Sequence, residues 1–305
     1  MKQVLLLFVS LLSVTVAAQD TDAARAEADS ILSLVQGMMN EPDAPRREFL
    51  PQGHLFEPIV LDPLEAQTYV SLLPSYTING DRYEGSMVPF AFGLRKPFWR
   101  WNREGWSSEF AIDVASFTQF EIYSDPTTRR QRRQLVNTDY RVGFWYNLKV
   151  REHAWRFRVY HLSSHLGDDY TIRNGISYYL PNAVNYEQVD LTYSHQRNGF
   201  RKYVGLGVVL RKPTERKRLA GQAGVYFRNL RNAASKARFV AGADVKVWEQ
   251  TAFKPGLHAG FGLELGTPSR HVTFLIEGYN GFRPYSLYEG QHVSWAGVGF
   301  YFSPI

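Results

Sequence analysis

The chain has 305 residues, a formal net charge of +6 and no cysteine. The lack of cysteine excludes disulfides, thiolate metal sites, a cysteine nucleophile and a cysteine-linked lipid anchor. A bundle of membrane-spanning helices is also excluded, because no apolar run past residue 18 reaches the roughly 18 to 20 residues that such a helix needs. Aromatic residues make up 15% of the chain, and the fold has to place this large apolar area.

The first 18 residues have the features of a secretory signal peptide. Lys2 supplies a positive charge, residues 4–16 form an apolar run, and Val16-Ala17-Ala18 offers small residues before a cleavage site. We therefore predict that residues 1–18 are removed and that a Gram-negative bacterium exports the protein beyond its inner membrane. Export makes nucleic acid an improbable partner.

Residues 19–66 are predicted to form a periplasmic lead-in, helical at first and then Pro-rich. Residues 21–40 contain four alanines and an apolar stripe with helical spacing, and Pro42 and Pro45 end the pattern. The stripe consists of Ile31, Leu32, Leu34, Val35, Met38 and Met39. It either docks on the main domain or binds a partner, and docking is the simpler interpretation.

From residue 67 onward the hydrophobic pattern has a period of two. Along 237–247, for example, apolar side chains alternate with polar or small ones, so a strand here has one apolar and one polar face. Twelve segments show this alternation, and many have ten residues or more. They are 67–76, 85–95, 107–123, 137–150, 154–164, 187–196, 200–210, 218–228, 236–249, 255–266, 270–280 and 291–302.

Amphipathic strands of this length favour a membrane barrel over a soluble sandwich, whose strands typically have about five or six residues. Closing the sheet satisfies the backbone hydrogen bonds inside hydrocarbon, with apolar faces toward lipid and polar faces toward the lumen. We predict an all-β fold: a transmembrane antiparallel up-and-down β-barrel of about 12 strands over residues 67–302, located in the cell outer membrane. A soluble periplasmic β-protein is the alternative.

The links between segments alternate in length, as a barrel with short periplasmic turns requires. Short links are expected at 151–153, 198–199 and 267–269, and long outward links at 124–136, 165–186 and 281–290. Asn198-Gly199 suits a tight hairpin turn, because both residues tolerate positive φ. The link at 96–106 breaks the rule, and Pro97, Trp99 and Trp101 there are candidates for an interfacial aromatic belt.

The last segment indicates a partner. Ala296, Val298, Phe300 and Phe302 alternate close to the C-terminus, which resembles the signal that barrel-assembly machinery recognises in outer-membrane proteins. In that signal an aromatic residue usually ends the chain, whereas here Ser303-Pro304-Ile305 follows.

The predicted lumen face carries charges of both signs. Its charged residues are Asp113, Arg141, Lys149, Arg156, Arg158, Asp190, Arg238, Asp244, Lys246, Glu264 and Glu277. Either these charges pair and fill the lumen, or they line a narrow polar channel or ligand site. Arg156 and Arg158 share a face and are candidate anion ligands, and Asp190 on the next strand is equally able to neutralise them.

Two basic runs lie in predicted outward loops. They are Arg129, Arg130, Arg132 and Arg133, and Arg211, Lys212, Arg216, Lys217 and Arg218. Together with the bilayer itself, the phosphates of lipopolysaccharide are the expected partners of these charges, and a merely solvated pair of loops is the alternative.

One constellation resembles a catalytic site. His161 and Ser163 lie two residues apart, so they share the lipid-facing side of their strand, and Glu187 begins the next strand with the same outward parity. A histidine beside a serine acts as a general base when a third group orients it. The arrangement resembles the His-x-Ser-Asn motif that outer-membrane phospholipases and lipid A deacylases carry on the barrel surface, although Ser164 replaces the Asn.

Other interpretations of the same stretch remain open. His161, Ser163, Ser164, His165 and Asp168 are able to form a hydrogen-bonded network that orders the following loop, with His165 and Asp168 as candidate ligand-binding residues. A metal site from His161, His165 and Asp168 is disfavoured, because a strand does not hold this spacing on one face unless it continues straight. No metal and no cofactor are predicted.

Two stretches together resemble a bacterial family. Residues 55–63 read Leu55-Phe56-Glu57-Pro58-Ile59-Val60-Leu61-Asp62-Pro63, and residues 161–168 read His161-Leu162-Ser163-Ser164-His165-Leu166-Gly167-Asp168. These are similar to the entry motif and the central motif of domain of unknown function 1207, with Leu61 in place of an Ala. The resemblance runs from about residue 50 to 302 and implies an outer-membrane, barrel-like protein without an assigned activity or catalytic residues.

The sequence therefore supports two functional hypotheses. The first is a non-enzymatic outer-membrane protein, either structural or a narrow polar pore. The second is a serine hydrolase of phospholipid or lipid A that uses Ser163 as nucleophile and His161 as base. Whether the protein forms oligomers is not predicted.

Overall fold

A computed structural model describes residues 29–33, 46–125, 128–176, 184–230, 236–267 and 270–303. The predicted signal peptide and most of the predicted helix 21–40 lie outside these residues. Residues 29–33 are helical, and Ile31 is buried against Leu148, Val150 and Trp155, as docking of the stripe requires. No helix in the described part of the chain is both long and apolar enough to cross a bilayer.

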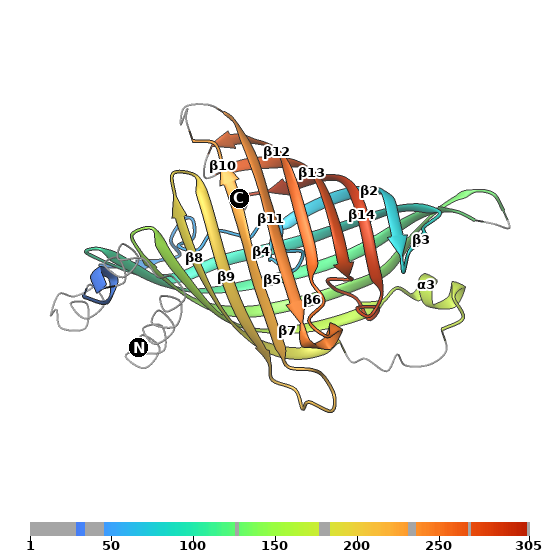
Figure 1. The fold of residues 1–305 in the computed structure, drawn as a ribbon, viewed down its shortest axis with the longest axis horizontal. Coiled ribbons are helices and arrows are strands. Elements are labelled where there is room, and N and C mark those ends of the chain that lie inside the picture. The colour runs from blue at the N-terminus through green and yellow to red at the C-terminus, as the bar shows by residue number, and fades with distance from the viewer. Residues whose placement is uncertain are drawn as a thin grey trace.

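Twelve strands close into a barrel, with two short ones beside it (Figure 1). The barrel strands are β2 (Thr68–Ile78), β4 (Gly85–Arg103), β5 (Trp106–Ser124), β6 (Gln131–Val150), β7 (His153–Leu166), β8 (Asn185–Arg197), β9 (Phe200–Val209), β10 (Leu219–Arg228), β11 (Ala237–Trp248), β12 (Gly256–Thr267), β13 (Arg270–Phe282) and β14 (His292–Phe302). The remaining elements are β1 (Arg46–Phe49), β3 (Asp81–Arg82), α3 (Asp168–Arg173) and the 3-10 turn η1 (Glu249–Thr251).

The sheet closes through β2, which lies between the last strand and β4. Phe302 of β14 pairs with Thr68, and Tyr69 pairs with Ala91 of β4, both antiparallel. Closure leaves no open barrel edge, so the backbone hydrogen bonds are made within the sheet. The predicted twelve-stranded antiparallel barrel is confirmed.

The predicted link at 96–106 is wrong. β4 continues to Arg103 and β5 starts at Trp106, so only residues 104–105 form the turn. Pro97 interrupts the alternation without ending the strand, because the pairing with β5 shifts register between Pro97 and Trp99. A bulge of this kind accommodates a residue that has no backbone N–H to donate.

The two ends of the barrel differ in their connections. We call one the short-turn end, because the links 104–105, 151–152, 198–199 and 268–269 lie there, with 229–236 as a longer exception. Asn198 and Gly199 have φ values of 52° and 80°, as a tight hairpin turn requires. The other, long-loop end carries the links 125–130, 167–184, 210–218, 249–255 and 283–291.

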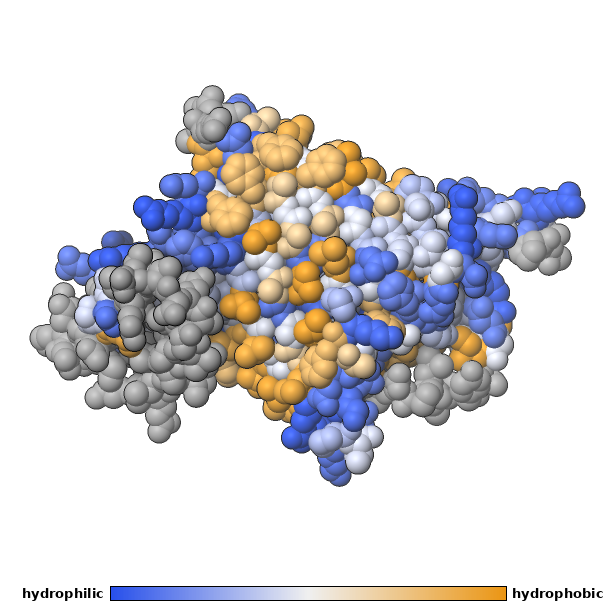
Figure 2. Space-filling model, in the orientation of Figure 1, coloured by the Kyte–Doolittle hydropathy of each residue, from blue (hydrophilic) through white to orange (hydrophobic). Residues whose placement is uncertain are grey.

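Apolar side chains cover the outside of the barrel between these ends. Figure 2 shows them gathered over the strands in the middle of the visible face, with polar side chains toward the edges and on the lowest loop. Large exposed hydrophobic residues include Phe92, Phe144, Leu206, Phe261 and Ile276. An exposed apolar belt of this size on a closed barrel is typical of a protein whose outer face meets lipid.

Residues 54–66, here called the lumen segment, lie inside the barrel before β2 begins. Phe56, Ile59 and Glu65 in this segment are among the most buried residues of the protein. Gly93 on β4 allows the close approach, because a Cβ there would lie 2.3 Å from the backbone nitrogen of Gln67. The sequence pattern predicts these residues outside the barrel, in the periplasmic lead-in, whereas their long-range contacts hold them in the lumen.

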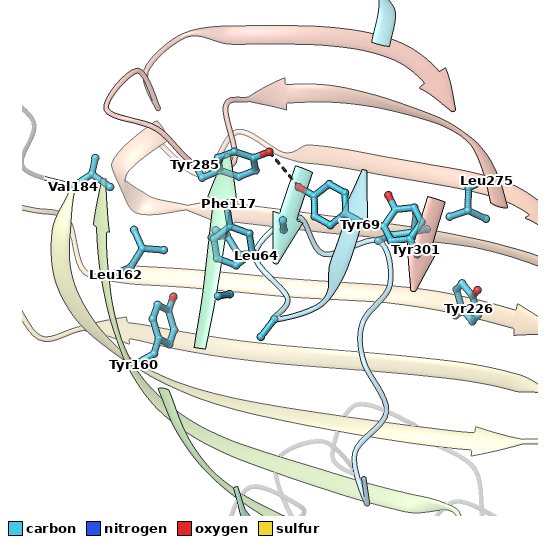
Figure 3. Close-up of a cluster of buried hydrophobic side chains, with 14 of the residues drawn as sticks. Leu64, Tyr69, Phe117, Tyr160, Leu162, Val184, Tyr226, Leu275, Tyr285 and Tyr301 are labelled. Carbon is cyan, nitrogen blue, oxygen red and sulfur yellow. Dashed lines mark hydrogen bonds between the residues drawn. The ribbon is translucent and has the colours of Figure 1, made fainter. Parts of the chain in front are cut away.

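Aromatic side chains pack against one another inside the lumen (Figure 3). The hydroxyl groups of Tyr69 and Tyr285 are 3.2 Å apart, and Tyr301 stacks on Tyr69 with ring centroids 5.3 Å apart. Phe117 and Leu64 belong to the same cluster. The high aromatic content therefore serves the interior of the barrel as well as its surface.

Candidate functional site

His161 and Glu187 face each other across the outer surface of β7 and β8. The two residues are direct partners in the antiparallel ladder, so their side chains leave the sheet on the same side. The Nδ1 of His161 lies 3.0 Å from Oε1 of Glu187, with both side chains nearly half exposed. A carboxylate that accepts a hydrogen bond from Nδ1 fixes the tautomer of the imidazole and leaves Nε2 as the available base.

Ser163 follows His161 on the same outward face. It pairs with Asn185 on β8, directly beyond the His161–Glu187 pair. Residues two apart on a strand are about 6.7 Å apart along it, so a rotation of the imidazole brings Nε2 toward the Ser163 hydroxyl. The side chains of His161 and Ser163 are not hydrogen-bonded to each other in the described structure, and catalytic hydrogen bonds often form only when substrate binds.

The surroundings of this pair are those of a lipid-facing surface close to the loops. On the neighbouring β6, Tyr140 and Val142 pair with Ser163 and His161 and are about half exposed. On the other side, Arg211 in the loop after β9 lies 3.4 Å from Glu187. The site is thus bordered by apolar side chains on one side and by a cation at the long-loop end on the other.

The other residues of the predicted motif point in different directions. Ser164 points into the barrel, where its hydroxyl donates to the buried carboxylate of Asp139. His165 points outward beside the ring of Tyr140, and Asp168 is exposed at the start of α3. Within the described residues these side chains thus have different partners, because alternate residues of a strand lie on opposite sides of the sheet, and the loop-ordering network stays a prediction.

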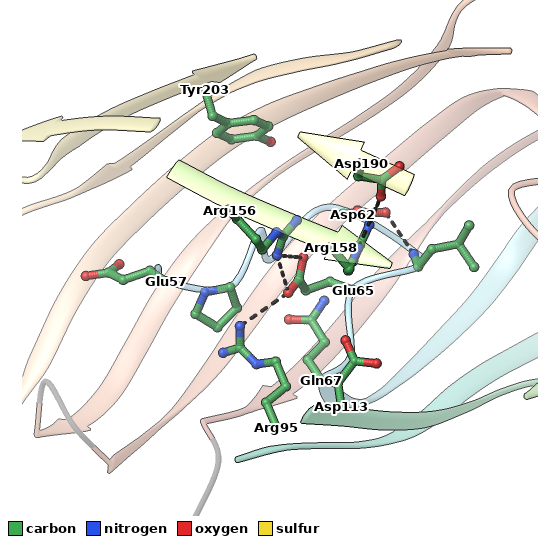
Figure 4. Close-up of polar contacts among 12 residues, drawn as sticks. Glu57, Asp62, Glu65, Gln67, Arg95, Asp113, Arg156, Arg158, Asp190 and Tyr203 are labelled. Carbon is green, nitrogen blue, oxygen red and sulfur yellow. Dashed lines mark hydrogen bonds and ion pairs between the residues drawn. The ribbon is translucent and has the colours of Figure 1, made fainter. Parts of the chain in front are cut away.

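Inside the barrel, Arg156 binds the lumen segment (Figure 4). Nη1 of Arg156 lies 2.9 Å from both carboxylate oxygens of Glu65, and Arg95 approaches the same carboxylate at 3.2 Å. All three side chains are almost fully buried. Burial favours the neutral acid, but the charges of Arg156 and Arg95 hold the pKa of Glu65 well below its usual range.

Arg158 is neutralised by the neighbouring strand. Its guanidinium donates two hydrogen bonds to Asp190, at 2.5 and 3.1 Å. Arg156 and Arg158 are thus both paired with carboxylates, and they do not form a free anion site in the described lumen. Asp190 was a predicted partner, whereas Glu65 was missed because nothing in its sequence context places it inside the barrel.

Other predicted inward charges also form ion pairs, whereas Lys149 is exposed at the end of β6 and Asp244 accepts hydrogen bonds from Tyr203 and Gln222. Arg141 pairs with Asp113, Arg238 with Glu264, and Lys246 with Asp62 of the lumen segment. Buried ion pairs of this kind satisfy charges that would otherwise be costly to enclose. Most of these inward charges are therefore paired, as one of the two predicted alternatives states.

The basic runs are only partly available to a ligand. Arg216 is buried and pairs with Glu289 through two hydrogen bonds of 2.7 and 2.8 Å, so it ties two loops together. Arg132 and Arg133 lie on β6 rather than in a loop. In the described residues, no group of three His, Asp or Glu side chains has the geometry of a metal site.

A family model described as a protein of unknown function, DUF1207, matches residues 14–303. The chain belongs to this family. No curated protein matches the sequence. The predicted membership is therefore confirmed.

Solved structures show the same kind of barrel. The outer membrane phospholipase from Escherichia coli matches with a TM-score of 0.51 and 12% identity, over 83% of this chain and 95% of that chain. The Salmonella typhi outer membrane phospholipase, a dimer with bound calcium, matches with a TM-score of 0.51 and 11% identity, over 78% of this chain and 91% of that chain. At this identity the likeness shows the fold alone, and it is the fold of outer-membrane proteins.

Proposed function

We propose that this protein is an outer-membrane serine hydrolase that cleaves acyl esters of membrane lipids at His161, Ser163 and Glu187. The observation that carries the proposal is the hydrogen bond of 3.0 Å between His161 Nδ1 and Glu187 Oε1 on the face that also presents Ser163. A lipid-facing surface normally carries apolar side chains. Here this surface instead carries Glu187, His161 and Ser163, which are the acid, base and nucleophile of a catalytic triad. This placement suits a substrate that reaches the site through the bilayer.

The expected chemistry is acyl transfer through a covalent intermediate. As the hydroxyl oxygen of Ser163 attacks the ester carbonyl, its proton moves to Nε2 of His161, which then returns it to the departing alcohol. A water molecule attacks the acyl-serine with the same base, releasing a fatty acid and restoring the serine. Glu187 stays ionised and stabilises the imidazolium through its hydrogen bond to Nδ1.

The position of the site also supports a lipid substrate. The apolar belt beside Tyr140 and Val142 contacts acyl chains, and Arg211, next to Glu187, is suited to a lipid phosphate. In a barrel whose short turns face the periplasm, this site lies in the outer leaflet. The bilayer and lipopolysaccharide are then its surroundings, and the barrel-assembly machinery is its expected partner through β14.

The test is fatty-acid release from phospholipid in mixed micelles by detergent-refolded protein. We expect the wild type to release fatty acid, His161→Asn to lose about 100-fold or more in rate, and Ser163→Ala to be inactive. The matched control is Ser116→Ala, because Ser116 faces outward on β5 and pairs with Tyr140, the residue that Ser163 pairs with from the other side.

Equal activity of the wild type and Ser163→Ala would refute the nucleophile, and no release by any folded protein from phospholipid or lipid A would refute the hydrolase. Folding is checked in each case by the change of gel mobility on heating. The second candidate function, a non-enzymatic structural barrel, is favoured by the filled lumen and would then stand. The filled lumen argues against a pore that is open at rest.

A further inference from the structure

A cavity of about 740 Å³ lies at the short-turn end, with part of the lumen segment in its wall. We call it the basic vestibule, after the side chains that line it: His54, Arg95, Lys96, Arg201, Arg228 and Arg270. Its volume is within the roughly 300 to 1,000 Å³ that is usual for small-molecule sites. Three other cavities between residues of the lumen measure only about 20 to 40 Å³ each.

The cations of the basic vestibule exceed its anions. Glu57 is the acidic residue in the lining, and it lies 3.3 Å from Arg228. Within the described part of the chain, Lys96 and Arg270 form no ion pair with a carboxylate, whereas Arg201 donates to the backbone oxygens of Glu57 and Pro58. Positive charges that gather around a concave, low-dielectric surface raise the local concentration of anions.

Arg95, which lines the basic vestibule, has a hydrogen-bond donor without a partner. Its side chain is 1% exposed, and while Nη1 binds Glu65, the buried Nη2 has no hydrogen-bond partner. A buried donor without a partner is costly, and Arg95 lines the cavity, so an oxyanion that reached this guanidinium would satisfy the donor. Nδ1 of His54 is also buried without a partner.

We propose that the basic vestibule binds a small molecule that carries a phosphate group. Arginine side chains recognise this group through paired N–H donors. The walls formed by Val60, Tyr226 and Tyr301 leave room for an apolar portion next to the phosphate. A soluble phosphate ester and the head group of a lipid share this chemistry. The site is separated from His161 and Ser163 by the barrel wall, so it does not depend on the proposed hydrolase.

Binding is measured by calorimetric titration of the refolded full chain in a nonionic detergent at constant ionic strength. The probes are inorganic phosphate, phenyl phosphate and dihexanoyl phosphatidic acid. Saturable binding of phenyl phosphate in preference to the lipid indicates a soluble ester, and the reverse order indicates a lipid head group. Either order supports the phosphate site.

Variants test whether the binding occurs in the basic vestibule. We expect Arg95→Gln to weaken binding about tenfold or more, and Lys96→Gln and Arg270→Gln to weaken it about threefold each. Arg151→Gln is the control, because Arg151 is an exposed cation in another turn at the same end. If Arg95→Gln does not fold, the double variant Lys96→Gln/Arg270→Gln takes its place, and weaker phosphate binding by this variant supports the site.

Two results would overturn the proposal. One is the absence of saturable binding of all three probes to the folded wild type. The other is a loss of affinity in Arg151→Gln as large as that in Lys96→Gln and Arg270→Gln, which would reveal attraction by the net charge rather than a site.

Discussion

The pair of His161 and Glu187 occupies a place where a membrane barrel normally carries apolar side chains. An exposed ion pair contributes little to stability, typically below about 1 kcal/mol. Stability therefore does not explain why the pair lies on the lipid-facing surface. Its geometry indicates that Glu187 orients the imidazole ring of His161. The adjacent Arg211 keeps a positive charge 3.4 Å from the same carboxylate.

Glu187→Gln tests this use of the carboxylate. The amide keeps the shape but loses the charge that stabilises the imidazolium, so we expect kcat for ester hydrolysis to fall about tenfold or more with little change in KM. Glu152→Gln is the matched control, since Glu152 is equally exposed and lies 3.5 Å from His195 at the opposite end. A Glu187→Gln protein with wild-type kcat would contradict the role of an orienting acid.

His54 makes the stability of the barrel depend on pH. Burial, together with the charges of Arg95 and Arg100, lowers its pKa to about 3. Between this value and the usual 6.5, the unfolded chain binds a proton that the folded chain does not. Stability is therefore present above pH 6.5 and is lost as the pH falls through this window, by on the order of 1 kcal/mol per pH unit.

Urea unfolding followed by tryptophan fluorescence at pH 7 and pH 5 measures this dependence. We expect the difference between the two midpoints to be smaller in His54→Gln than in the wild type. Protonation of carboxylates such as Glu65 at lower pH acts in the same direction, and the comparison of the two proteins isolates the histidine. An unchanged difference would show that His54 titrates normally.

At the scale of elements, the lumen segment neutralises several of the buried cations of the barrel wall. Glu65 neutralises Arg156 and Arg95, Asp62 neutralises Lys246, and backbone carbonyl groups of the segment accept hydrogen bonds from Arg201. The segment thus supplies anions and acceptors to cations on several strands of the barrel wall. A buried arrangement of this kind fixes the position of the segment, because displacement would leave several charges without partners.

We expect Glu65→Gln to destabilise the folded barrel by about 3–5 kcal/mol, because two buried guanidinium groups lose their shared carboxylate. The midpoint of urea unfolding in detergent measures the effect. Glu48→Gln serves as the control, since Glu48 is exposed on β1 and its carboxylate accepts a hydrogen bond from Asn102 at 3.5 Å. A shift of equal size in both variants would show that Glu65 is not a structural anchor.

At the scale of the whole molecule, the sheet is closed and side chains occupy much of its lumen. The sheet has no free edge, its outside is apolar, and its lumen is occupied by aromatic residues and ion pairs contributed by distant parts of the chain. Such a barrel is a rigid support for groups on its outer surface rather than a conduit. Function is then expected where polar groups break the pattern: on the lipid face of β7 and β8 and in the basic vestibule.

The filled lumen predicts that the wild-type protein does not conduct steadily when inserted into a planar bilayer at low voltage. The aromatic cluster around Tyr69 and Tyr285 and the lumen segment occupy the interior of the described barrel. Single-channel recording beside a general porin, which serves as the control for insertion, measures this. A stable open-channel current from the wild type would contradict a closed lumen and would support the pore hypothesis instead.

The sequence alone determined the barrel, because a strand exposes alternate residues to opposite surfaces and this period is visible without any partner. It located twelve strands, the turn at Asn198-Gly199, and the outward parity of His161, Ser163 and Glu187. It failed at 96–106, where Pro97 suggested an end and the register shift with β5 accommodated it instead.

Only the tertiary structure decided what fills the lumen and which groups pair. Glu65 and Arg156 are 91 residues apart, and no local pattern connects them, since pairing across a barrel depends on closure and register. The position of residues 54–66 inside the barrel follows from the same long-range contacts. The cavity lined by His54, Arg95 and Arg270 likewise exists only because three distant segments meet at the short-turn end.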